Sequence, residues 1–171
     1  MKRYFNVLII ALMLFLLCSC GKSTDELISS KMTNEPGGSC TISIKCDTLL
    51  DNMDRLKESK RDFVPEKGII LDTTKVDFFK GASVYDILKQ VCEENNIHME
   101  ASYSITFKSS YIEGINQLYE YDAGEKSGWM FSVNSKFPNY GASSYQVSDG
   151  DNIEFVYTCD LGKDVGDNSM K

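Results

Sequence analysis

The chain has 171 residues, 42% of them hydrophobic, and a formal net charge of −7 at pH 7. Residues 1–19 contain Lys2 and Arg3 and no acidic residue, so the remainder carries 16 basic and 25 acidic residues, a net charge of −9. Binding to nucleic acid relies on lysines and arginines that neutralise phosphates, and adhesion to anionic lipid relies on basic clusters. The composition therefore argues against both kinds of electrostatic partner.

The N-terminal segment has the layout of a secretory signal that ends in a lipidation site. Lys2 and Arg3 precede an unbroken apolar run at 7–17, which ends in Leu17-Cys18-Ser19-Cys20. A single membrane span is the alternative, but a span needs about 20 apolar residues. We therefore expect residues 1–19 to be a lipoprotein signal peptide and Cys20 to be diacylated. The lipid would anchor a bacterial protein to the cell membrane on its extracytoplasmic face.

The rest of the chain divides into a tether, one domain and a short tail. Residues 20–39 are polar and contain Pro36-Gly37-Gly38, a composition typical of a flexible tether. Residues 40–166 have the length of a single ordinary domain. Residues 167–171 are expected to form a polar tail.

The first half of the domain contains two strand-like segments and one helical segment. Residues 40–46 alternate between apolar and polar side chains, which predicts a half-buried strand. Residues 47–59 predict a turn and a short helix, and residues 69–80 a second extended segment. Ser83 begins a capping box, and the apolar spacing after it predicts a helix that ends near Asn95.

The second half of the domain consists of short aromatic segments of strand character, at 97–107, 111–121, 129–133 and 153–159. Asp149-Gly150-Asp151 precedes the last of them. A calcium loop is one interpretation of these two aspartates, but the other ligands of an EF-hand are missing. We interpret the segment as a tight turn.

One helix among several strands predicts a single α+β domain, and a β-grasp-like mixed sheet with one main helix fits the order of the elements best. In that arrangement the first and last strands lie side by side and parallel. Cys46 and Cys159 end these strands on the core face, so we expect a disulfide between them. The pairing of Cys40 and Cys92 stays open, since four cysteines allow three pairings.

No set of catalytic residues is recognisable, so we expect a protein that is not an enzyme. The sequence contains no nucleophile motif, phosphate-binding loop or zinc-protease motif. His98 is the only histidine and lies in an amphipathic strand segment, which favours an ordinary strand residue. A metal site is not expected either, because the cysteines are widely spaced.

Aromatic residues crowd the last third of the domain, and some of them fall in a predicted loop. Phe137 and Tyr140 flank Pro138-Asn139 in that loop, where exposed rings are typical of a recognition surface. Trp129 lies in a predicted strand, where packing in the sheet is the alternative to ligand contact. The candidate ligand-binding residues are Asn134, Phe137, Tyr140, Tyr145 and Trp129.

Residues 128–157, GWMFSVNSKFPNYGASSYQVSDGDNIEFVY, resemble the carboxy-terminal domain of transcobalamin and intrinsic factor, and a related bacterial family of secreted domains of unknown function. Residues 46–54 and 111–116 are also similar to longer bacterial members, so the resemblance extends over residues 40–166. The resemblance includes a version of the domain that has cysteines near the positions where this chain has Ala123 and Ala142.

The resemblance implies a domain that closes over cobalamin from one side. The helical barrel that holds the other side in transcobalamin has no counterpart in this sequence. Two functions are therefore expected. The first is a lipoprotein that captures a corrinoid, cobalamin or a related compound, and passes it to a membrane transporter or surface protein. The alternative is an interaction module that docks a surface protein and binds no small molecule.

Overall fold

The computed structural model describes residues 32–167, so the expected signal peptide, Cys20 and most of the tail lie outside the described residues. The described part contains two β-sheets and one α-helix, which is consistent with a single α+β domain. Within it, no helix is both long and apolar enough to cross a membrane.

The larger sheet has four strands in the order β2-β1-β7-β6. They are β1 (Pro36–Lys45), β2 (Ile69–Phe79), β6 (Gly128–Val133) and β7 (Asn152–Thr158). β1 pairs parallel with β7 and antiparallel with β2, and β6 pairs antiparallel with β7. The first and last strands therefore lie side by side and parallel, as expected.

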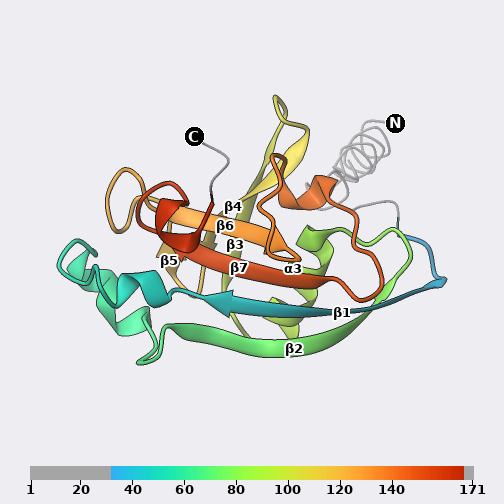
Figure 1. Ribbon diagram of the computed structural model, residues 1–171, viewed down its shortest axis with the longest axis horizontal. Coiled ribbons are helices and arrows are strands. Elements are labelled where there is room, and N and C mark those ends of the chain that lie inside the picture. Colours follow the sequence, from blue (N-terminus) through green and yellow to red (C-terminus); the bar gives the residue numbers. More distant parts are fainter. Residues whose placement is uncertain (1–31, 168–171) are drawn as a thin grey trace, which may run out of the picture.

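The helix α3 (Val84–Glu94) and the second sheet lie behind the four-stranded sheet in the view of Figure 1. Ser83 caps α3 through the predicted capping box: its hydroxyl accepts from the Asp86 amide, and its own amide donates to the Asp86 carboxylate. The apolar side of α3 is buried against the sheet, with Val84, Ile87, Leu88 and Val91 at most 1% exposed.

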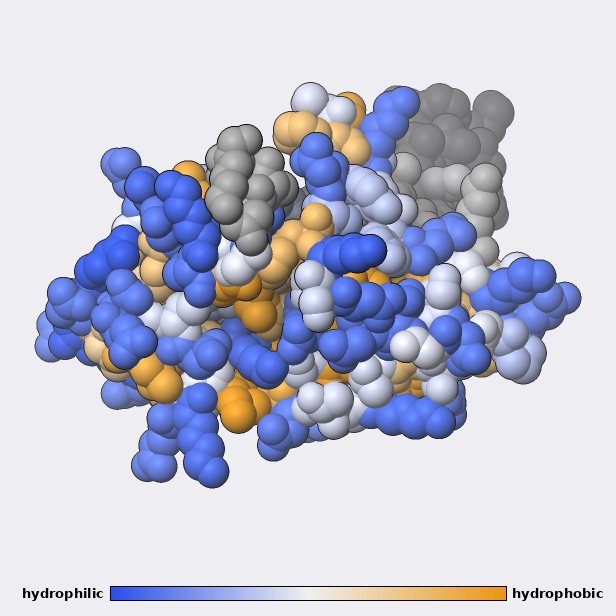
Figure 2. All heavy atoms as spheres, viewed as in Figure 1, coloured by the Kyte–Doolittle hydropathy of each residue, from blue (hydrophilic) through white to orange (hydrophobic). Residues whose placement is uncertain are grey.

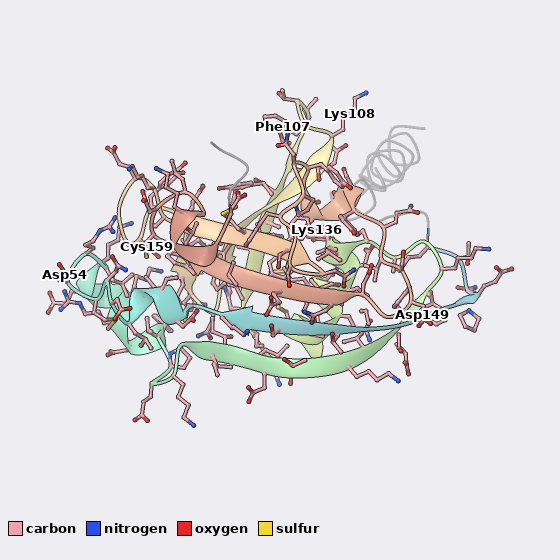
Figure 3. The ribbon with its side chains drawn as sticks, viewed as in Figure 1. Asp54, Phe107, Lys108, Lys136, Asp149 and Cys159 are labelled. Carbon is pink, nitrogen blue, oxygen red and sulfur yellow. The ribbon has the colours of Figure 1, made fainter. Side chains whose placement is uncertain are left out.

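The second sheet corrects the expectation of one mixed sheet. It contains β3 (Met99–Ser104), β4 (Ser109–Ile115) and β5 (Leu118–Tyr119), which form an antiparallel sheet of their own. β3 and β4 form a hairpin that projects from the body of the protein, with Phe107 and Lys108 at its tip (Figure 3). Alternation of apolar and polar residues predicts that a segment forms a strand, but it does not predict which sheet that strand joins.

Two boundaries also differ from the sequence prediction. β1 begins at Pro36, inside the expected tether. Proline is tolerated at this position because it is the first residue of the strand. A Cβ at Gly38 would come within 2.6 Å of the Asp149 carboxylate, so the glycine permits close packing between β1 and the segment that contains Asp149. The helix expected within 47–59 is replaced by two 3-10 turns, η1 (Asp47–Leu49) and η2 (Glu58–Phe63).

The expected disulfide is not formed, and the four described cysteines are buried free thiols. The strand register gives the reason. Lys45 ends β1 opposite Val156 on β7, so Cys46 directly follows this pair, whereas Cys159 comes three residues after Val156, just beyond the end of β7. Directly opposite positions are the ones that bring two side chains of neighbouring strands closest together, and these two cysteines do not occupy such positions.

Candidate functional site

A cleft opens between the β3–β4 hairpin and the loop that follows β6. It has a volume of about 620 Å³. The hairpin and the loop contribute side chains of only two kinds, aromatic or apolar rings and small neutral polar groups. The lining residues are Ser102, Ser104, Phe107, Ser109, Ser110, Tyr111, Pro138, Asn139, Tyr140 and Gly141.

The two walls of the cleft are joined through the short 3-10 turn η3 (Ala142–Ser144). The Ser143 hydroxyl accepts a 2.8 Å hydrogen bond from the Ser110 amide and lies 3.1 Å from the Ser109 hydroxyl. Gly141 makes this contact sterically feasible, since a Cβ there would lie 2.1 Å from Ser109 Oγ. The hairpin and the loop are thus held at a defined distance by hydrogen bonds and close backbone packing.

Tyr140 forms the exposed end of a row of aromatic rings on the loop wall. Its ring is 56% exposed and stacks on Tyr145 with 5.8 Å between centroids. Tyr145 meets Phe131 edge to face at 6.3 Å, and Phe131 stacks on the buried Phe155 at 5.7 Å. Burial raises the pKa of Tyr145, so this phenol stays neutral. A flat ligand surface that packs on Tyr140 would extend a row of rings fixed to the core.

Tyr111 contributes a ring from the hairpin wall. Its hydroxyl donates a 2.5 Å hydrogen bond to the Glu120 carboxylate. Burial and this hydrogen bond raise the pKa of Tyr111 well above its ordinary value, so the phenol keeps its proton. Because the hydroxyl already has a partner, Tyr111 offers the cleft an aromatic surface more than a polar group.

A smaller cavity of about 180 Å³ lies beside the cleft and reaches toward the core. Phe137 and Trp129 line it, and it shares Ser110, Tyr111, Pro138 and Gly141 with the cleft. Phe137 is half-buried, whereas its neighbour Tyr140 is exposed. The two aromatic residues of the loop therefore occupy different environments.

The cleft has no charged side chain among its lining residues. Serine hydroxyls and the Asn139 amide can donate and accept hydrogen bonds, and the rings offer apolar faces. A carboxylate or phosphate would find no cation there to pair with. The chemistry of the lining suits a neutral ligand with a flat apolar surface and polar groups at its edge. Nor do residues 32–167 contain any cluster of His, Cys, Asp or Glu side chains suited to a metal ion.

The structure brings four of the five predicted binding residues to this region, although one of them, Trp129, is packed as a core residue. Tyr140 lines the cleft, Phe137 lines the adjoining cavity, and Tyr145 supports Tyr140 from behind. Trp129 also borders the small cavity, but it is only 7% exposed. Its indole donates a 2.8 Å hydrogen bond to the Leu118 carbonyl and packs edge to face on Tyr157 at 5.3 Å. Its packing is that of a core residue.

Asn134 lies away from the cleft, in the turn after β6, with φ at +51°. Its amide nitrogen donates to the Asp151 carboxylate at 2.8 Å, and its amide oxygen accepts from the Asn152 backbone at 2.9 Å. Both polar atoms expected to orient a ligand therefore bind within the protein. The role of Asn134 is to hold this turn against the start of β7.

The hairpin serines are the part of the site that the sequence prediction missed. Ser102 lies opposite Tyr111, and Ser104 opposite Ser109, in the β3–β4 register. The mixture of serines and aromatic residues in 102–111 was the available signal, but such a composition also describes an ordinary exposed hairpin. Only the position of the hairpin beside the 137–141 loop turns these residues into one wall of a cleft.

Comparison with known proteins finds similarity to one family model over part of the chain and to solved structures. Residues 81–158 match the sequence model of the family described as "Domain of unknown function (DUF4430)". No curated protein sequence matches the chain. A protein from Ruminococcus gnavus, titled a "putative metal binding protein", aligns at a TM-score of 0.39 and 16% identity, over 71% of this chain and 96% of its own.

The structure of haptocorrin in complex with Cbi aligns at a TM-score of 0.54 and 17% identity. The alignment covers 72% of this chain but only 25% of haptocorrin, so the chain corresponds to about a quarter of that protein's length. Similarity at this level of identity establishes a shared fold. This chain and the aligned quarter of haptocorrin therefore share a fold.

Proposed function

We propose that this protein is a surface-anchored lipoprotein that captures a corrinoid, cobalamin or a related compound, for uptake. The observation that carries the proposal is the neutral, aromatic cleft between the β3–β4 hairpin and the 137–141 loop. Its position on a fold shared with haptocorrin, a protein solved in complex with Cbi, supports a corrinoid as the ligand. The parallel β1–β7 pair with α3 on one face also supports a β-grasp-like classification.

The open shape of the cleft implies a two-part binding site. A pocket that binds a small molecule tightly usually buries 70% or more of it, whereas this cleft has only the hairpin and the loop as walls. We therefore expect weak binding by the protein alone and tighter binding when a membrane transporter or surface protein covers the exposed side of the ligand. The role proposed is binding and transfer, with no catalytic step.

Titration of the purified full chain in detergent with cyanocobalamin tests the proposal. Binding should shift the corrinoid absorbance, and detergent alone should not. Tyr140→Ala should weaken binding with little change in melting temperature, because its ring is largely exposed. Phe79→Ala is the matched control, since Phe79 is 54% exposed on β2 and lies outside the cleft. Equal loss from both variants, or no binding by the wild type, would contradict the proposal.

Anchoring through Cys20 is a separate part of the proposal and has its own test. Lys2, Arg3, the apolar run and Cys20 motivate it. The wild type should give a processed species in the membrane fraction that detergent extracts, and Cys20→Ala, which prevents lipidation, should remove that species. A Cys20→Ala protein that is still processed and membrane-bound would show that Cys20 is not the anchor.

The alternative function, a protein-interaction module without a small ligand, is favoured by one observation. Ile105 and Phe107 at the hairpin tip are 84% and 80% exposed, and hydrophobic residues gather there in Figure 2. Exposed apolar groups of this kind are typical of protein contacts. If this function is correct, the full chain will bind no corrinoid, and crosslinks to a surface protein will start from the hairpin tip.

A further inference from the structure

The Ser110 hydroxyl is a buried polar group that lacks a partner. Among residues 32–167, only Ser43 and Ser110 have a buried side-chain oxygen without a hydrogen bond. Ser110 is 2% exposed and lies on β4. Buried polar groups are nearly always hydrogen-bonded, and an unpaired one destabilises the folded protein. An unpaired hydroxyl in a candidate binding site therefore suggests a partner that comes from outside the chain.

The position of Ser110 connects this hydroxyl with the cleft. Ser110 lines both the 620 Å³ cleft and the 180 Å³ cavity. The residues common to the two are Ser110 and Tyr111 on the hairpin, and Pro138 and Gly141 on the loop. The hydroxyl therefore belongs to one of the four residues that the cleft and the cavity share, and it is buried there.

The backbone at Ser110 is fixed while its side chain is left unpaired. Its amide donates to the Ser143 hydroxyl at 2.8 Å, and the neighbouring Ser109 hydroxyl lies 3.1 Å from the same oxygen. Ser143 therefore pairs with the Ser109 hydroxyl and the Ser110 amide, whereas the Ser110 hydroxyl stays unpaired. A fixed backbone with a free hydroxyl is well suited to recognise a ligand group in one orientation.

We propose that Ser110 is the polar anchor of the ligand, and that the ligand reaches its hydroxyl by displacing Pro138, while the Ser143 hydrogen bonds and the packing of Gly141 against the hairpin stay in place. This inference rests on the proposed function. The ligand group that meets Ser110 is a neutral amide or hydroxyl, because a serine hydroxyl both donates and accepts. The lining contains no cation for an acidic group. The flat body of the ligand then packs on Tyr140.

Two matched serine variants test the inference. Ser110→Ala and Ser43→Ala each remove one buried, unpaired hydroxyl, but Ser43 lies on β1 and lines neither cavity. The full chain in detergent is titrated with cyanocobalamin and, separately, with dicyanocobinamide. Ser110→Ala should weaken binding about tenfold, the loss of one hydrogen bond. Ser43→Ala should bind as the wild type does, and Ser110→Thr, which keeps a hydroxyl, should retain more affinity than Ser110→Ala.

The outcomes separate this inference from the proposed function. A wild type that binds neither corrinoid overturns both. A wild type that binds while Ser110→Ala binds equally well overturns only the role of Ser110. Urea denaturation supplies a readout that needs no ligand: removing an unpaired hydroxyl should leave both variants at least as stable as the wild type. If Ser110→Ala alone is clearly destabilised, its hydroxyl has a partner within the protein, and the inference is wrong.

Discussion

Trp129 illustrates how one aromatic side chain can border a cavity and still act mainly as a structural residue. Its indole is 7% exposed, donates to the Leu118 carbonyl and packs on Tyr157. Trp129→Phe should lower the free energy of unfolding by about 2 kcal/mol, since it removes a buried hydrogen bond and leaves unfilled volume. Because Trp129 is the only tryptophan, unfolding in urea should be followed by circular dichroism. Unchanged stability would show that the indole is not part of the core.

At single positions the sequence predicts side-chain chemistry better than side-chain partners. The aromatic character of Phe137 and Tyr140 indicates a recognition loop, and Tyr140 does line the cleft. Asn134 has the right chemistry to orient a ligand, but its amide holds the turn after β6 against the start of β7. Asparagine tolerates a positive φ and is common in turns. The choice between these two roles depends on Asp151, whose proximity to Asn134 is set by the strand pairing.

The helix α3 is the element that the sequence predicts most completely. Ser83, the capping box and the apolar spacing together define its start and its buried side. Ser83→Ala should destabilise the protein by about 1–2 kcal/mol, because it removes the N-cap of a buried helix end. Urea denaturation measures the effect, and Ser144→Ala, at an exposed position, should change stability by less than about 0.5 kcal/mol. Similar values for the two variants would contradict a stabilising cap.

The contact between the hairpin and the 137–141 loop depends on Ser143. Its hydroxyl holds both the Ser110 amide and the Ser109 hydroxyl. Ser143→Ala should leave these two buried groups unpaired and cost about 2 kcal/mol. The sharper readout is hydrogen exchange at the Ser110 amide, which should accelerate, whereas exchange in α3 should follow only the change in global stability. Unaltered protection of the Ser110 amide would show that another group holds the loop.

Strand and helix positions follow from local patterns, but the division of the strands into two sheets does not. Residues 40–46 and 153–159 alternate cleanly because one side of each faces the core. The strands β3 and β4 have the same kind of local signal, although they form a separate sheet. Contacts between distant segments decide which sheet a strand joins. The cleft exists only because β3 and β4 form a hairpin outside the larger sheet.

At the scale of the whole molecule, the parallel β1–β7 pair shows both the reach and the limit of sequence reasoning. The pairing follows from the order of the elements, and it is present. The disulfide expected between the ends of these strands fails by a register offset of two residues, which no pattern within either strand reveals. The four described cysteines consequently contribute to the fold as buried thiols.

Burial of these thiols makes the stability of the whole domain sensitive to alkaline pH. Burial, with smaller contributions from nearby acidic groups, raises the pKa of Cys46 and Cys92 from 9.0 to about 12, and that of Cys40 to about 11. Below pH 9 the thiols are protonated in both the folded and the unfolded chain, so their stabilising contribution is fully present. Above pH 9 the unfolded chain loses these protons first. The free energy of unfolding should therefore fall as the pH rises toward 11.

Each thiol that stays protonated in the folded protein should contribute a slope of about 1.4 kcal/mol per pH unit within that window. Urea denaturation between pH 8 and pH 10.5, with reductant present, measures the total slope. Cys92→Ala should be less stable at every pH but should show a shallower slope, because one titrating group is gone. Cys46→Ala should show the same shallower slope. If Cys46 is a free thiol, the wild type should have the same stability with and without reductant. An unchanged slope in both variants would mean that these thiols are not the groups that titrate on unfolding.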